Sequence, residues 1–235
     1  LQIDASSRSA WSQSPLVARL HPSGAVDISR GDALLATIEL NAHGPAWSHA
    51  PQKSATAEIS DIADGSGKRF VGALPIPQTD GGAIQYTENV KTLSQGLQLE
   101  YSLAMTKAMK LNGLQFSINL PVTQYAGKEA LIAQLRDDPK LVGFPEEQPQ
   151  EGRFQLWSGQ GSKIEVAKGT DKAFTLELRA AADVLIQDLR QWDNTVFEVR
   201  LPAIMENEGR VISDGDRFHL DLTITFTEPV QLRGP

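Results

Sequence analysis

Two short segments of the chain each place a glutamate and an arginine two residues apart within an alternation of apolar and polar residues. Glu177 and Arg179 alternate with the apolar residues of segment 174–178, and Glu198 and Arg200 alternate with those of segment 197–201. Successive side chains of a β-strand point to opposite faces, so each Glu–Arg pair lies on one polar face. If the two strands are neighbours, opposed carboxyl groups lie about 5 Å apart, as in a retaining glycosidase.

This pattern predicts Glu177 and Glu198 as the acid and the nucleophile of a glycoside hydrolase. One carboxyl group would protonate the glycosidic oxygen, and the other would attack the anomeric carbon. The neighbouring Arg179 and Arg200 would keep one carboxylate ionised, while burial raised the pKa of the other. The alternative is that both Glu-x-Arg pairs form solvated cross-strand ion pairs, which contribute only tenths of a kcal/mol.

Aromatic and amide side chains on the polar halves of other segments form a second group of candidates. Aromatic planes stack on the apolar faces of sugar rings, and amide or guanidinium groups bind the hydroxyls. Trp47, in the long loop 41–53, and Trp192, at a strand end, are considered as further ligand contacts, although large aromatic residues also brace loops. The residues predicted to position sugar rings are Trp157, Gln98, Gln115, Gln155, Arg179, Arg200 and His219, with Glu88 and Glu100 as reserve carboxylates.

The elements that must position these residues are short strands. Seven segments alternate with period two, namely residues 34–40, 97–105, 114–120, 154–158, 174–178, 197–201 and 218–226. Turn-forming Gly, Pro and Asp residues separate them, which indicates an all-β, antiparallel sandwich or jelly roll. We expect one domain over residues 1–235, a concave polar face, a Ser-rich lead-in at residues 5–13, and one short helix at residues 128–136, which are rich in helix-forming residues.

Composition excludes several classes of function. The net charge of −7 and the absence of a basic stripe argue against nucleic-acid binding, and no apolar run reaches the length of a spanning helix. There is no cysteine, the four histidines are dispersed, and the Asp214-Gly215-Asp216 turn lacks the other ligands of a calcium loop. The sequence therefore predicts no metal site and no cofactor, although a structural calcium ion is left open.

Two longer runs resemble a known family. Residues 96–121, GLQLEYSLAMTKAMKLNGLQFSINLP, followed by Tyr125-Ala126-Gly127, resemble the central strands of galactose-mutarotase-like sandwiches. Residues 214–226, DGDRFHLDLTITF, are similar to the strand that closes such domains. Domains of this type occur in sugar epimerases, glycoside hydrolases and polysaccharide lyases, so the resemblance implies a β-sandwich and a sugar substrate. It assigns no catalytic residue.

The sequence thus predicts a carbohydrate-active protein that hydrolyses a polysaccharide or oligosaccharide. A non-catalytic carbohydrate-binding module would use the same polar face without a carboxylate pair, and a polysaccharide lyase is a further alternative. A third class is a sandwich whose polar face is solvated or covered by a protein partner. The chain begins at Leu1 without a methionine, which either a removed signal peptide or a trimmed sequence would explain. We expect a secreted or periplasmic location, mainly because of the predicted architecture.

Overall fold

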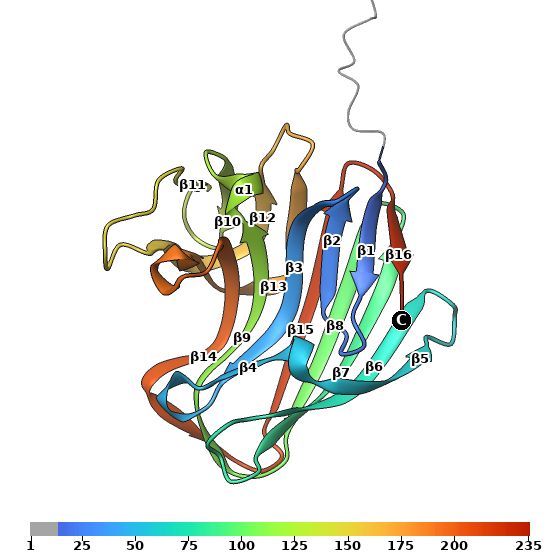
Figure 1. The fold of residues 1–235 in the computed structure, drawn as a ribbon, viewed down its shortest axis with the longest axis vertical. Coiled ribbons are helices and arrows are strands. Elements are labelled where there is room, and N and C mark those ends of the chain that lie inside the picture. Colours follow the sequence, from blue (N-terminus) through green and yellow to red (C-terminus); the bar gives the residue numbers. More distant parts are fainter. Residues whose placement is uncertain (1–13) are drawn as a thin grey trace, which may run out of the picture.

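The computed structural model describes residues 14–235, so the predicted lead-in at residues 5–13 lies outside the described part. Strands dominate it, and they are joined into one curled, mostly antiparallel sheet (Figure 1). The strands are β1 Leu16–Leu20, β2 Val26–Arg30, β3 Ala33–His43, β4 His49–Pro51, β5 Thr56–Asp61, β6 Gly67–Pro75, β7 Ala83–Leu93, β8 Gly96–Met105, β9 Met109–Pro121, β10 Glu129–Gln134, β11 Lys140–Gly143, β12 Gln155–Val166, β13 Phe174–Asp188, β14 Val196–Ile212, β15 Arg217–Phe226 and β16 Val230–Arg233. The helical turns are η1 Pro45–Trp47, η2 Gln52–Ser54, α1 Val122–Tyr125 and η3 Leu189–Trp192.

The strands form two layers that pack face to face (Figure 1). One layer runs β16-β1-β2-β3-β9-β14 and the other runs β15-β8-β7-β6-β5. Strand β13 joins them, because its residues 185–188 pair with β14 whereas its residues 174–178 pair with β15. One long strand therefore contributes to both layers.

Between the layers lies the apolar core, formed by the apolar half of each alternating strand. Tyr101 of β8 and Phe116 of β9 meet edge to face across the two layers, with ring centroids 4.8 Å apart. Leu99 and Tyr86 of the second layer and Ile118 of the first are also almost fully buried. The predicted β-sandwich is confirmed.

The predicted helix at residues 128–136 is wrong, because this segment forms strand β10. Ala130 and Ile132 are fully buried, whereas Glu129 is exposed, so the burial follows the period of two expected of a strand. β10 pairs with β12 on one side and β11 on the other. Tertiary burial therefore overrides the helix propensity of Ala and Leu. In the described part of the chain, the one α-helix is the single turn α1, which lies just before this segment.

Each layer also has a polar outer face. We call them the β3–β9–β14 face, formed by the outward side chains of β2, β3, β9, β14 and the end of β13, and the β7–β8–β15 face, on the opposite side of the sandwich. Within residues 14–235, no helix has the length and apolar composition needed to cross a membrane.

Candidate functional site

The structure divides the predicted site residues between these two faces. Gln115, Glu198 and Arg200 lie on the β3–β9–β14 face, where Glu198 stands opposite Gln187, and Gln187 stands opposite Gln155. The residues on the β7–β8–β15 face are Gln98, Glu100, Glu177, Arg179 and His219. The single polar face expected from the sequence is therefore two faces, because the alternating strands belong to two packed layers.

The predicted pairing of Glu177 with Glu198 is wrong. The residue of β13 that stands opposite Glu198 is Gln187, whereas Glu177 stands opposite Thr223 of β15 and Lys163 of β12. Ten residues separate Glu177 from Gln187 along β13, which corresponds to roughly 30 Å of extended strand. The strands that carry the two glutamates are neighbours, but their register keeps the carboxyl groups apart.

The candidates on the β7–β8–β15 face are solvated. Arg179, whose side chain is 78% exposed, approaches Asp221 at 3.8 Å. Gln98 donates to Asp221 at 3.1 Å and to Glu100 at 3.3 Å. His219 lines a shallow groove of about 760 Å³ on this face. The long contact between the exposed Arg179 and Asp221 contributes little free energy.

Trp157 and Glu88 do not lie on either outer face. An irregular register between Gln155 and Trp157 places Trp157 opposite Ile186, and the indole packs against the core. Such a bulge changes the face to which the following side chains point, so Trp157 does not share the face of Gln155. Glu88 is fully buried between the layers.

The β3–β9–β14 face carries a dense polar cluster centred on Glu198, which is 2% exposed. Oε1 of Glu198 accepts a hydrogen bond from Ser117 Oγ at 2.5 Å, and Oε2 accepts one from Gln187 Nε2 at 2.6 Å. Arg200 donates to the same Oε2 through Nε at 3.0 Å and also approaches it through Nη2 at 2.9 Å. Four donor groups thus engage this carboxylate, which makes it an anchor for the guanidinium group. Within residues 14–235, the one contact of Nη1 of Arg200 is with the sulfur of Met205, at 4.0 Å.

Two histidines from β3 and β4 stack beside this cluster. The rings of His43 and His49 lie 5.1 Å apart at an angle of 19°. His43 contacts the side-chain nitrogen of Gln115 through Nε2 at 3.1 Å, and His49 contacts Oδ1 of Asn41 at 2.8 Å. Burial, with a smaller contribution from His49, lowers the pKa of His43 to about 4, and burial also lowers the pKa of His49. Both imidazoles are therefore neutral at pH 7.

Trp47 forms an aromatic wall next to these histidines. Ala46 and Trp47 are consecutive non-glycine residues with left-handed φ angles of 54° and 59°, a strained backbone of the kind often found at ligand sites. The indole, on a residue that is 37% exposed, contacts the His43 ring edge to face at 5.4 Å. A Cβ atom built on Gly113 would lie 2.9 Å from His43, 3.2 Å from Trp47 and 3.2 Å from Oε1 of Gln115. The three side chains therefore converge over Gly113.

Glu39 brings a second carboxyl group to this face. It stands opposite Ser117 of β9 and is 7% exposed. Burial raises its pKa above the ordinary value, against the opposing effect of the nearby Lys53. The Lys53 ammonium group itself pairs with Asp27, at 3.0 Å. Glu39 thus has the environment of a carboxyl group that keeps its proton to a higher pH than an ordinary glutamate does.

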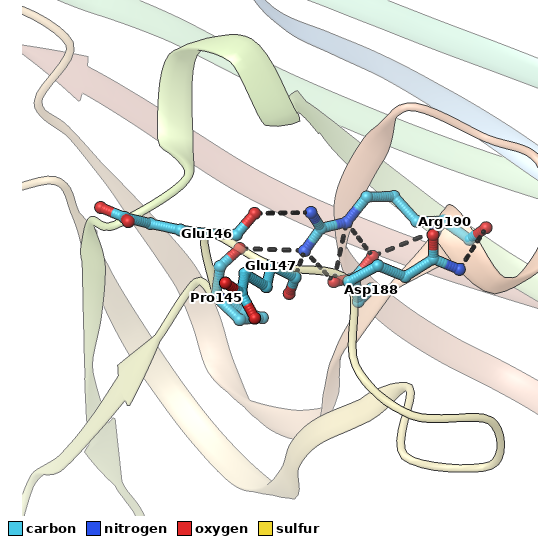
Figure 2. A network of polar contacts seen from close by, with 6 residues as sticks. Pro145, Glu146, Glu147, Asp188 and Arg190 are labelled. Carbon is cyan, nitrogen blue, oxygen red and sulfur yellow. Dashed lines mark hydrogen bonds and ion pairs between the residues drawn. The ribbon is translucent and has the colours of Figure 1, made fainter.

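The end of β13 next to Gln187 is fixed by a polar network (Figure 2). Arg190 pairs with the buried Asp188 at 2.6 Å and donates to the carbonyl oxygens of Pro145, Glu146 and Glu147 at 2.9–3.1 Å. The guanidinium group therefore ties the connection between β11 and β12 to η3. This network is structural, and it holds the strand end that carries Gln187.

Glu39, His43, His49, Ser117 and Gln187 are missing from the residues predicted from the sequence. His43 and His49 share the segment expected to be a long loop, and such a pair was expected to be two unrelated surface imidazoles, but β4 folds back onto β3 and places them opposite each other. The alternation of segment 34–40 continues through Asn41 and His43, and this signal could have identified the polar side of β3. Among residues 14–235, no group of three or more His, Cys, Asp or Glu side chains is arranged to hold a metal ion.

No protein-family model matches the chain, and no curated protein matches it in sequence. Solved structures do match its fold. A galactose mutarotase-like protein from Lactobacillus casei ATCC 334 aligns with a TM-score of 0.56 at 11% identity, over 90% of this chain and 97% of that one. The Slr1438 protein from Synechocystis sp. PCC 6803 aligns with a TM-score of 0.52 at 8% identity, over 88% and 89% of the two chains.

The 4-alpha-glucanotransferase from Thermococcus litoralis also aligns, with a TM-score of 0.53 at 9% identity, over 90% of this chain but only 36% of that one. This chain therefore corresponds to about a third of the length of the transferase. At such low identities the likeness concerns the fold. The resemblance expected from the two sequence runs is confirmed: the chain has the fold of galactose-mutarotase-like β-sandwiches.

Proposed function

We propose that the β3–β9–β14 face binds a glycan and that the protein is carbohydrate-active. The observation that carries this proposal is that two polar groups, on Gln115 and Arg200, lack hydrogen-bond partners within residues 14–235 and lie near the exposed indole of Trp47. Oε1 of Gln115 is buried and has no hydrogen-bond partner within residues 14–235, and Nη1 of Arg200 has no oxygen partner in the same part of the chain. A sugar hydroxyl, which both donates and accepts, suits such a pair of groups.

The aromatic wall supports the same proposal. Trp47 is partly exposed and stands beside the buried amide of Gln115 and the neutral His43. Sugar sites combine an apolar ring surface with a few fixed polar groups in this way. The solved structures of similar fold include proteins with sugar-related names, which agrees with a glycan ligand.

Hydrolysis is the activity that we propose for this face, with Glu39 as the proton donor in place of the Glu177 expected from the sequence. Glu39 would protonate the glycosidic oxygen as that bond breaks, a water molecule would attack the anomeric carbon, and the proton that the water loses would return to the Glu39 carboxylate. A general acid must hold its proton near the working pH, and burial raises the pKa of Glu39 in that direction. Glu198 has both oxygens engaged by Ser117, Gln187 and Arg200, so it positions Arg200 rather than attacks a substrate. A secreted or periplasmic location remains part of the proposal.

The test is a binding and turnover assay with gluco-, galacto- and manno-oligosaccharides, by calorimetry and by release of reducing ends. We expect Trp47→Ala and Arg200→Ala each to weaken binding at least about tenfold, which corresponds to 1.4 kcal/mol or more. Arg179→Ala, on the opposite face, is the matched control and should bind normally. Glu39→Gln should retain binding and lose at least about 100-fold in turnover. Binding that depends on Arg179 but not on Arg200 would contradict the proposal.

A further inference from the structure

The two cationic side chains nearest to Glu198 and Glu39 on the β3–β9–β14 face, Arg200 and Lys53, are each paired with a carboxylate. Arg200 directs both Nε and Nη2 at one oxygen of Glu198, and the two side chains are 13% and 3% exposed. Lys53 directs its ammonium group at Asp27, at 3.0 Å. Each of these cations is therefore already neutralised before a ligand arrives.

The histidines add no positive charge near neutral pH. Burial lowers the pKa of His43 to about 4 and lowers that of His49, and this effect outweighs the opposing charge of Glu198, while Arg200 lowers the pKa of both rings further. Their ring nitrogens contact the neutral amides of Gln115 and Asn41. These imidazoles act as uncharged hydrogen-bonding groups.

Glu39 is the remaining ionisable group at the centre of this face. Its Oε2 accepts a hydrogen bond from the backbone nitrogen of Lys53 at 3.4 Å, whereas the ammonium group of Lys53 is directed at Asp27. Any charge on Glu39 is negative and would repel an anionic ligand. A carboxylate or phosphate group in this partly buried site would lose its hydration without gaining an unpaired cation.

We propose that the glycan bound by the β3–β9–β14 face is uncharged, and that the site discriminates against uronic acids and phosphorylated sugars. The inference rests on the proposed glycan site and specifies its ligand class. Nη1 of Arg200 then serves as a donor to a sugar hydroxyl, and its charge remains with Glu198. The lyase alternative, which needs a cation to neutralise a uronate, loses support for the same reason.

The experiment compares neutral galacto-oligosaccharides with galacturonic acid oligomers of the same length, by calorimetry at pH 7 and low salt. We expect the neutral series to bind at least about tenfold more tightly than the acidic one. Glu39→Gln, which cannot take up a negative charge, should narrow this gap, and its difference from the wild type should grow as the pH is raised and Glu39 of the wild type loses its proton. Glu58→Gln, a change on β5 in the other layer, is the control and should leave it unchanged.

The outcomes separate this inference from the proposed function. Tighter binding of the galacturonic acid oligomers, lost in Arg200→Ala, would overturn the neutral-ligand inference and leave the glycan site intact. Binding of neither series, nor of the neutral gluco- and manno-oligosaccharides, would overturn the proposed function and this inference with it. A preference for the neutral series that Trp47→Ala abolishes supports both.

Discussion

Glu88 gives the fold a pH-dependent stability that can be measured directly. It is fully buried in the core, where Oε2 accepts a hydrogen bond from Gln52 at 2.7 Å. Its other oxygen has no partner within the described residues 14–235. Burial raises the pKa of Glu88 to about 8, against the opposing effects of the nearby Tyr101 hydroxyl and of the hydrogen bond from Gln52. The carboxyl group is therefore protonated in the folded protein at pH 7.

The sign of the effect follows from the raised pKa. The folded state binds this proton more tightly than the unfolded state, whose glutamate has an ordinary pKa of about 4.5. The contribution to stability is fully present below pH 4.5 and is lost as the pH rises through 8. The free energy of unfolding should fall by about 1.4 kcal/mol for each pH unit in this window, a total on the order of 4–5 kcal/mol.

Glu88→Gln isolates this contribution because glutamine does not ionise. Urea unfolding, followed by circular dichroism between pH 4.5 and 9, gives the free energy of unfolding of both proteins. We expect the free energy of unfolding of Glu88→Gln to rise relative to that of the wild type as the pH rises, by about 1.4 kcal/mol for each pH unit. Glu58→Gln, outside the core, should show no such slope. A difference between the wild type and Glu88→Gln that stays flat from pH 5 to 8 would refute the reasoning.

Three further predictions concern the site and the core. The pKa of His43 in the folded protein is lowered to about 4, so its contribution to stability is present above pH 6.5 and is lost as the pH falls through 4. In urea unfolding, the free energy of unfolding of His43→Gln should therefore fall less on acidification than that of the wild type, by up to about 3 kcal/mol. Gly24 has a φ of +95°, and a Cβ atom built there would lie 2.0 Å from Oε2 of Glu88. Gly24→Ala should therefore lower the free energy of unfolding by more than about 2 kcal/mol, whereas the control Gly65→Ala, which has open space around it, should lower it by about 1 kcal/mol. Gly113→Ala would press on His43 and Trp47 and should weaken glycan binding about tenfold in calorimetry, with unchanged affinity as the contradicting result.

The sequence predicted the sandwich because alternation reports which side of each strand is apolar. Segments such as 114–120 and 218–226 form β9 and β15 with the expected inward and outward sides. Alternation does not report which layer a strand joins. β13 joins both layers, so Glu177 and Gln187 of one strand lie on opposite faces of the molecule. The expected helix failed for a related reason, since the burial of Ile132 depends on a pairing partner distant in sequence.

The site was only partly predictable. Gln115, Gln155 and Arg200 were predicted because their polar neighbours alternate regularly, and the structure places all three on the β3–β9–β14 face. The convergence of Trp47 and His43 over Gly113 depends on a left-handed turn at Ala46 and Trp47, which ordinary residue preferences disfavour. The role of Glu198 as an anchor depends on strand register, because Ser117 and Gln187 come from two different strands on either side of it. Neither feature can be read from local sequence.

Backbone amide NMR of the protein titrated with a neutral oligosaccharide is the most direct measurement of whether the β3–β9–β14 face binds sugar. The account predicts chemical-shift changes concentrated at His43, Trp47, Gln115 and Arg200, with little change at His219 in the groove of the opposite face. Changes concentrated around His219, with none at Trp47 or Arg200, would contradict it.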